Sequence, residues 1–259
     1  MIEKQLHQTH QERFSNRAED YAKYRPSYSS ETVDCISEGL GNPNQLVAAD
    51  IGAGTGISSR LLADRGIRII AIEPNAAMRQ AATPHSLIRF EDGNAENTQL
   101  QDNSVDLVTC FQAFHWFNPE PTLKEFARIL KPKGRLAIVW NNRDRQDEFT
   151  KEYSNLMKIA SKATKSKSKS REDKIKSLRN TPFFSSVCHL VFFHQHTLNR
   201  DGLIGRAMSA SYVPKTGKVS QKLTRKLNKL YDRYCDDDGL VYFKYKTDVY
   251  LTSSVFIEH

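Results

Sequence analysis

The clearest chemical motif of this 259-residue sequence is a glycine-rich turn that follows an apolar run. Residues 47–58 read VAADIGAGTGIS, in which the run ends at Asp50 and the glycines are Gly52, Gly54 and Gly56. Such a turn between a strand and a helix is typical of sites for adenosine-bearing cofactors. Ile57 stands where a dinucleotide fingerprint needs a further glycine, and no Gly-Lys-Ser/Thr follows for a phosphate-binding loop. The turn therefore suits a ligand that has no diphosphate.

An acidic residue lies where a cofactor ribose would need one. Glu73 ends the next apolar run, in IIAIEPN, seventeen residues after Gly56. A carboxylate at the end of the second strand can accept hydrogen bonds from ribose hydroxyls. A structural role before Pro74, at the start of a helix, is the alternative reading.

The elements that must position these residues alternate between short apolar runs and helical patterns. The runs lie at residues 46–51, 67–72, 86–91, 105–111, 135–140, 187–193 and 240–253, and helical signals lie at 57–64, 75–82 and 121–130. This alternation predicts an α/β fold with a Rossmann-like, doubly wound, seven-stranded, mostly parallel sheet and a helical lid. We expect the long final run to add an antiparallel edge strand. Ligands of such sheets bind at the carboxyl ends of the strands.

Several ordered motifs resemble those of class I S-adenosylmethionine-dependent methyltransferases. They are D-x-G-x-G-x-G, the acid after the second strand, DGNAEN (92–97), FQAFHWF (111–117) and ILKPKGRLAIV (129–139). FSNRAEDYAKYRPSY (14–28) and AFHWFN (113–118) resemble the type 11 group, which includes trans-aconitate methyltransferase-like small-molecule enzymes. The resemblance covers residues 14–143; beyond them only the strand pattern and RAMSASYVP (206–214) support it.

The resemblance implies roles for the residues that would bind S-adenosylmethionine. Asp50 would orient the glycine turn and the methionine amino group, the three glycines would back the cofactor, and Glu73 would hold the ribose. Asn94 and Ala95 would contact adenine, although the family usually has aspartate where Asn94 stands. Gln112 would lie beside the methionine part, unless it is a surface glutamine.

The resemblance also implies a lid before the first core helix, in YAKYRPSY (21–28). Tyr21 and Tyr24 would pack near the sulfonium, and Arg25 would meet the methionine carboxylate. Packing at a helix end is the alternative for these residues.

The acceptor site is predicted from the residues that follow the fourth and fifth strands. His115 would take a proton from the acceptor or donate a hydrogen bond to an anionic one, and Trp116 would contact the acceptor. A packed aromatic corner is the alternative for both. Asn142, Arg143 and Tyr212 are further acceptor-site candidates. His194 and His196 share a strand face, but no third ligand lies near in sequence, so we predict a solvated face and no metal site.

Charge and cysteine usage limit the partners. The formal net charge is +8, and residues 151–179 alone hold ten Lys/Arg and three Asp/Glu. This Lys/Ser-rich tract predicts a solvated helix end or loop, or alternatively an electrostatic guide for an anionic substrate. The four cysteines (Cys35, Cys110, Cys188 and Cys235) contain no C-x-x-C pair, and no signal peptide or membrane span is evident. We therefore expect reduced, mostly buried thiols and a cytoplasmic protein.

Taken together, the sequence predicts an enzyme that transfers a methyl group from S-adenosylmethionine to an oxygen of a small, anionic or hydroxyl-bearing molecule. The predicted division is 1–35 (lid and first helix), 36–143 (cofactor core), 144–182 (Lys/Ser-rich helical insertion) and 183–259 (rest of the sheet, with a helical lid insertion at 200–236). One rival is a nucleic-acid or protein methyltransferase that uses the basic 158–179 segment, although the confined charge argues against nucleic acid. The other is a non-catalytic cofactor-binding protein.

Overall fold

The computed structural model describes residues 23–161, 171–210, 212–214 and 216–255, which form two compact units. The sheet unit comprises the described residues within 28–141, 171–192 and 247–255. The helical unit comprises those within 23–27, 142–161 and 193–246. Each unit has its own apolar core and is described by itself.

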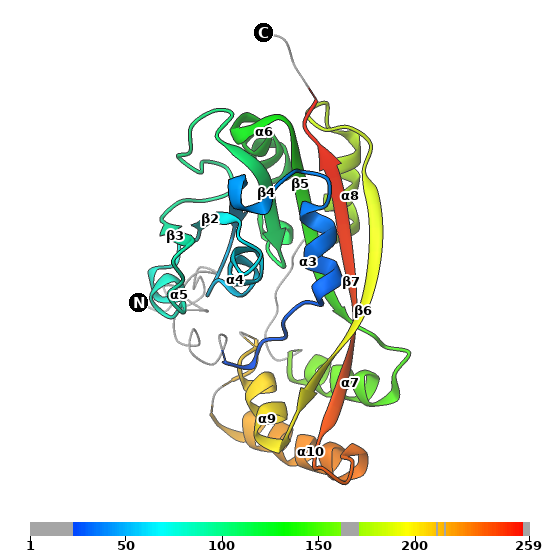
Figure 1. Ribbon diagram of the computed structural model, residues 1–259. Coiled ribbons are helices and arrows are strands. Elements are labelled where there is room, and N and C mark those ends of the chain that lie inside the picture. Colours follow the sequence, from blue (N-terminus) through cyan, green and yellow to red (C-terminus); the bar gives the residue numbers. More distant parts are fainter. Residues whose placement is uncertain (1–22, 162–170, 211, 215, 256–259) are drawn as a thin grey trace, which may run out of the picture. The chain divides into compact units, whose positions relative to one another are not determined.

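A seven-stranded sheet has the order β3-β2-β1-β4-β5-β7-β6 (Figure 1). The strands are β1 (Val47–Ile51), β2 (Arg68–Ile72), β3 (Ile88–Glu91), β4 (Val105–Phe111), β5 (Leu130–Arg143), β6 (Cys188–Leu198) and β7 (Val241–Ser253). Neighbouring strands from β3 to β5 pair in parallel. The predicted Rossmann-like, mostly parallel sheet is therefore confirmed.

The antiparallel end of the sheet differs from the prediction in one respect. The final apolar run forms β7, which lies between β5 and β6 rather than at the edge. The edge strand is β6, which runs antiparallel to β7 (Figure 1). Burial explains the exchange: β7 buries every second residue from Val241 to Val249, whereas Leu198 is the one fully buried position that β6 has. A strand with one well-buried face suits the interior of a sheet, and a mostly exposed strand suits its edge.

β5 begins earlier than its apolar run suggests. Leu130 pairs with Val105, and the register shifts before Leu107 pairs with Arg135. The residues between, KPKG, are therefore part of the strand, with an irregularity that accommodates them. The sequence placed the strand start at residue 135 because these polar residues carry no apolar periodicity.

Helices cover both faces of the sheet unit. They are α3 (Ser30–Ser37), α4 (Ile57–Ala63), α5 (Ala76–Gln80), α6 (Pro119–Ile129) and α8 (Arg171–Asn180), with short 3-10 turns η1 (Pro43–Gln45) and η2 (Phe114–Trp116). Successive residues of β1 point to opposite faces: Ala48 joins the core that includes α3 and α4, and Ala49 joins the core that includes α6 and α8. The near-continuous apolar strands of the sequence follow from this two-sided burial.

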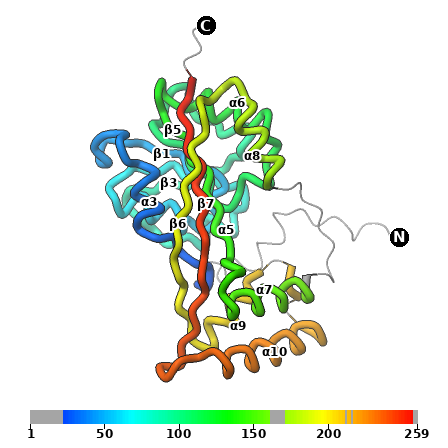
Figure 2. Tube along the Cα trace, turned by 90° about the vertical axis from the view of Figure 1, so that its right-hand side faces the viewer, coloured from blue at the N-terminus to red at the C-terminus, as the bar shows by residue number. Residues whose placement is uncertain are grey.

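The helical unit contains α7 (Glu148–Ser161), α9 (Arg200–Met208) and α10 (Lys218–Tyr234), together with the far ends of β6 and β7. α10 buries Leu223, Leu227, Leu230 and Tyr231 on one face at helical spacing, and it packs against α7 and α9 (Figure 2). The predicted lid insertion at 200–236 contains α9 and α10. The predicted insertion at 144–182 contains α7 in the helical unit and α8 in the sheet unit; residues 162–170 of the Lys/Ser-rich tract lie outside the described residues.

The thiols are less buried than the sequence suggested. All four cysteines are free, but full burial is found only for Cys110; Cys35 and Cys235 are half-buried, and Cys188 is exposed on the edge strand β6. The expectation for Cys188 was wrong because an apolar run at a sheet edge has one face toward solvent. Among the described helices, none is long and apolar enough to cross a membrane.

Candidate active site

The glycine turn connects β1 to α4 in a conformation that needs its glycines. Gly52, Gly54 and Gly56 have φ angles of 69°, 60° and 74°, in the left-handed region that side chains disfavour. A Cβ on Gly52 would lie 2.7 Å from the Cβ of Ala113, and one on Gly56 would lie 2.8 Å from the ring of Phe90. The turn therefore combines unusual dihedral angles with close packing against the loops of neighbouring strands.

Asp50 links the residues that flank the glycine turn through hydrogen bonds of its side chain. Its Oδ2 accepts hydrogen bonds from the hydroxyls of Ser58 (2.7 Å) and Ser59 (2.6 Å), and its Oδ1 accepts one from Thr109 (2.9 Å). Its side chain is fully buried. Burial raises the pKa of the carboxyl, and the three hydroxyl donors offset part of that rise. Asp50 thus ties the first turn of α4 to β1 and β4, and its predicted role toward the methionine amino group stays a prediction.

Glu73 connects the ends of β1 and β2. Its Oε2 accepts a hydrogen bond from the backbone N–H of Gly54 at 2.9 Å, and its Oε1 accepts one from the N–H of Asn75 at 2.9 Å. Burial raises its pKa, and these two N–H donors lower it in part. The carboxylate therefore both supports the glycine turn and orders the start of α5. Each oxygen keeps a second acceptor position for a ligand hydroxyl.

The loop after β3 places Ala95 and Asn94 differently. Ala95 is buried, whereas Asn94 is exposed and its Oδ1 accepts hydrogen bonds from the N–H groups of Glu96 (3.0 Å) and Asn97 (2.8 Å). The Asn94 side chain therefore closes a local turn. The Oε1 of Glu96 accepts from the N–H of Asn118 at 2.9 Å, which joins this loop to the one after β4.

Gln112 stands directly after β4 with a φ of 55°, which is uncommon for a residue other than glycine. Its Nε2 donates to the carbonyl oxygen of Asn141 at 2.8 Å, and the side chain is half-buried. Residues held in such conformations concentrate at functional sites. The contact favours a positioned side chain at the strand ends over the alternative of a surface glutamine.

His115 and Trp116 lie in η2, at the same edge. The indole Nε1 of Trp140 donates a hydrogen bond to the Nδ1 of His115 at 3.3 Å. Because the indole nitrogen can only donate, Nδ1 must be the acceptor, and the neutral ring then carries its hydrogen on Nε2. The ring of Trp116 lies 4.5 Å from that of His115, and Trp116 is 42% exposed. The predicted aromatic corner exists, and His115 presents an N–H donor from it.

Sequence reasoning missed two cations beside this edge. The guanidinium of Arg171 lies 5.6 Å from the centre of the Trp140 ring, and the buried Lys174 donates to the carbonyl oxygen of Phe117. Both belong to α8, which forms the C-terminal end of the Lys/Ser-rich tract at 151–179. The sequence analysis treated that tract as one basic segment and did not consider these two residues individually.

Other predicted residues belong to the helical unit. They are Tyr24, Arg25, Asn142, Arg143 and Tyr212. Tyr24 packs against Gly205 of α9, where a Cβ would meet its ring at 2.5 Å. The guanidinium of Arg143 lies 5.0 Å above the ring of Tyr153. Tyr21 lies outside the described residues, and the roles of all six toward a cofactor or an acceptor stay predictions.

Comparisons with known proteins agree with this geometry. Residues 49–138 match the family described as a methyltransferase domain. An uncharacterised methyltransferase of Mycobacterium tuberculosis is 35% identical over 147 residues, which are 56% of this chain and 58% of the relative. The malonyl-[acyl-carrier protein] O-methyltransferase of Acetivibrio thermocellus is 31% identical over 147 residues, which are 53% and 50% of the two chains. The aligned part thus spans only about half the length of these relatives.

A solved structure extends the likeness in fold. A proposed type II methyltransferase of Anaeromyxobacter dehalogenans superimposes with a TM-score of 0.65 at 20% identity, covering 91% of this chain and 100% of the other. The matched family segment contains the glycine turn, Glu73, Gln112 and His115. Residues 49–138 therefore match the methyltransferase-domain family, and the fold of the chain is one that a proposed methyltransferase shares.

Proposed function

We propose that this protein transfers a methyl group from S-adenosylmethionine to an oxygen nucleophile of a small molecule. The observation that carries the proposal is the hydrogen bond from the N–H of Gly54 to the carboxylate of Glu73. This bond holds a glycine turn with left-handed dihedral angles beside that carboxylate. This arrangement fits a ligand with a ribose and an amino-acid part, since it joins hydroxyl acceptors to a backbone that can be approached closely.

In this proposal each residue at the strand ends has a defined role. The glycines back the cofactor, Glu73 accepts from the ribose hydroxyls, and Gln112 lies beside the methionine part. Ala95 and Asn94 flank the adenine, with Ala95 as the main contact because the Asn94 oxygen already serves its loop. Asp50 is a positioning residue, because no part of its side chain is exposed.

The reaction needs alignment more than it needs a catalytic base. Bound S-adenosylmethionine supplies a methyl group that its positive sulfur already activates. A lone pair of the acceptor oxygen forms the new O–C bond while the S–C bond breaks and the sulfur keeps its electron pair. Orientation and exclusion of water can supply roughly 7–11 kcal/mol of the barrier.

The tautomer of His115 favours an anionic acceptor. Trp140 occupies Nδ1, so the ring offers a donor at Nε2 rather than a base. A carboxylate acceptor needs no base and accepts such a hydrogen bond well. One relative is an O-methyltransferase by name, which supports oxygen as the nucleophile. We therefore favour formation of a methyl ester, with His115 as the donor that holds the acceptor.

Calorimetric titration of the full chain with S-adenosylmethionine tests cofactor binding. We expect Glu73→Ala to weaken binding by at least about 30-fold, because charge-assisted hydrogen bonds are lost and the turn loosens. Glu120→Ala, at an exposed position of α6, is the matched control and should bind as the native chain does. Absence of binding at millimolar cofactor, or equal binding by Glu73→Ala, would overturn the proposal.

A radiolabelled methyl-transfer screen over a metabolite extract tests the acceptor. Products should release the label as methanol in mild base, as esters do and ethers do not. His115→Gln keeps a donor near the Nε2 position and should retain more activity than His115→Phe. Equal loss in the two variants, with a base-stable product, would point to a hydroxyl acceptor and a base role for His115.

A further inference from the structure

The helical unit contains a polar cluster inside its apolar core. Tyr153 and Ser154 come from α7, Arg206 from α9, Tyr245 from β7 and His196 from β6. Tyr153 and Tyr245 pack among the apolar residues of this core, beside Phe243. Side chains from four elements therefore bring their polar atoms into a region that otherwise excludes water.

The polar atoms of this cluster lack partners among the described residues. They are Nε and Nη1 of Arg206, the hydroxyls of Tyr153, Ser154 and Tyr245, and Nδ1 of His196. The exposed fractions of Arg206, Tyr153, Ser154 and Tyr245 are 4%, 0%, 3% and 2%. Folded proteins pair nearly all buried polar groups, because a lost hydrogen bond to water is otherwise not replaced. Tyr245 neighbours Arg206, but none of the six atoms meets a partner in full hydrogen-bond geometry among the described residues, which leaves the cluster with unused donors.

The charge of the cluster is positive. The groups that influence the phenol of Tyr153 are Arg206, Arg143, Tyr245 and Tyr212, and none of them is a carboxylate. Burial opposes the charge of Arg206, but the neighbouring Tyr245 and Tyr153 favour it, and its pKa lies above the ordinary value. Burial, Arg206 and His194 lower the pKa of His196 to about 4, so this ring is neutral at pH 7. Within the described part of the chain, no carboxylate pairs with this buried guanidinium.

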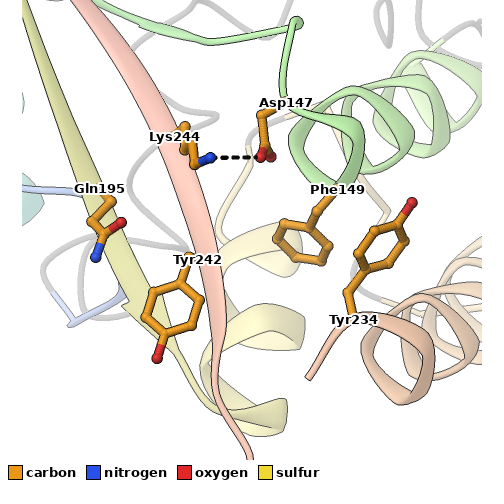
Figure 3. A pocket seen from close by; sticks show the side chains of 6 residues that line it. All are labelled: Asp147, Phe149, Gln195, Tyr234, Tyr242 and Lys244. Atoms are coloured by element: carbon orange, nitrogen blue, oxygen red, sulfur yellow. Dashed lines mark ion pairs between the residues drawn. The ribbon is translucent and has the colours of Figure 1, made fainter. Parts of the chain in front are cut away.

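Three other cations of the same unit are paired with acids. Lys244 lies 3.3 Å from Asp147 in a pocket of about 480 Å³ (Figure 3). Arg233 lies 3.0 Å from Glu152, and Arg200 lies 2.6 Å from Asp232. These pairs are more exposed than Arg206 and need their partners less. Arg206 differs from these three in being buried and in having no carboxylate partner among the described residues.

We propose that Arg206, together with Tyr153, Ser154, Tyr245 and His196, forms a binding site for the carboxylate group of a small molecule. The guanidinium and the three hydroxyls are hydrogen-bond donors that match an acceptor-only group. Arg206 is the fully buried cation of the cluster, whereas Arg143 beside Tyr153 is only half-buried, so a singly charged carboxylate matches the buried charge. The site lies wholly within the helical unit and is inferred independently of the glycine turn, so either inference can fail without the other.

Binding of carboxylate probes to the full chain, without S-adenosylmethionine, tests the site. Succinate, glutarate and citrate are the probes, and succinamide and inorganic phosphate are the comparison compounds. We expect at least one carboxylate to raise the melting temperature and to give a calorimetric isotherm, whereas succinamide does neither. Arg206→Met should weaken that binding by about tenfold or more, because a charge-assisted contact is lost. Tyr245→Phe removes only a hydroxyl and should weaken binding by several-fold while the fold is kept.

The matched control is Arg225→Met, which removes an exposed arginine of α10 and should bind the probes as the native chain does. Absence of binding by all three carboxylates at tens of millimolar would overturn the proposal. Equal binding by the native chain, Arg206→Met and Tyr245→Phe would also overturn it. Binding of phosphate alone would overturn the assignment to carboxylates.

Discussion

The sheet unit and the helical unit both bury charged side chains. Among the described residues, the buried carboxylates Asp50 and Glu73 of the sheet unit have hydrogen-bond donors, whereas buried nitrogens of Arg206 in the helical unit have no acceptor. Asp50 has three hydroxyl donors, and both oxygens of Glu73 accept backbone N–H groups. Arg206 has two buried nitrogens without a partner among the described residues. In the two proposals made above, this difference separates a preorganised cofactor site, whose charges hold the backbone in place, from a cluster whose charge is available to a ligand.

The largest effect should come from breaking the satisfied network. Asp50→Ala leaves the hydroxyls of Ser58, Ser59 and Thr109 without their acceptor, and each buried, unsatisfied group costs about 1–3 kcal/mol. We expect the free energy of unfolding, measured by urea denaturation, to fall by about 3 kcal/mol or more. Asp34→Ala, which removes a carboxylate exposed at the surface beside Arg65, should cost less than about 1 kcal/mol. Similar values for the two variants would contradict a central role of Asp50 in the fold.

For the helical unit, the comparison predicts that a substitution of the buried charge raises the free energy of unfolding instead of lowering it. Arg206→Met replaces an uncompensated buried charge by an apolar side chain of similar length. We expect the free energy of unfolding of the unliganded chain to rise by about 1–2 kcal/mol, since the desolvation penalty disappears. A loss of 2 kcal/mol or more, measured in the same urea titration, would show that Arg206 is a structural residue and would remove the contrast between the units.

A smaller effect should appear as a pH dependence that belongs to His196. Its pKa in the folded chain is about 4, whereas an unfolded histidine titrates near 6.5. The unfolded state therefore takes up a proton first as the pH falls from 6.5 to 4, and folding stability declines over this window. Because the ring is only half-buried, solvent screening limits the loss to at most about 2 kcal/mol.

His196→Gln should remove that part of the pH dependence while leaving stability at pH 8 nearly unchanged. Urea denaturation of both chains at pH 8, 6 and 4.5 gives the comparison. In an NMR titration, Arg206→Met should move the pKa of His196 toward its ordinary value, because the nearest positive charge is gone. An unchanged value would place Arg206 too far from His196 to share one site.

Most of the sheet could be predicted from local patterns. The apolar runs at 46–51, 67–72 and 105–111 became β1, β2 and β4 with ends displaced by at most one residue. The position of β7 could not be predicted, because strand order depends on which edges remain open after β1 to β5 have paired. For the same reason the exposure of Cys188 could not be predicted from its apolar neighbours in sequence. It results from the position of β6 at the edge of the sheet.

The candidate site divides in the same way. The glycine turn and Glu73 were predicted from spacing, because a strand, its turn and the following helix are adjacent in sequence, whereas Gln112 was predicted from the family resemblance. The tautomer of His115 could not be predicted from spacing, since it depends on Trp140, which lies twenty-five residues away on β5. His194 and His196 were expected on a solvated face, but both are half-buried, and His194 stacks on Tyr245 at 5.2 Å. That expectation was wrong because the neighbouring strand and helices cover this face.

The sequence by itself determined the cofactor turn and its chemistry. Left-handed dihedral angles at Gly52, Gly54 and Gly56 are a local property of the chain, and an acid after the next strand is brought to them by any parallel pairing of β1 and β2. Only the tertiary structure decided the cluster around Arg206. Its members at positions 153, 196, 206 and 245 have no common spacing, and their meeting depends on how α7, α9, β6 and β7 pack their apolar faces together.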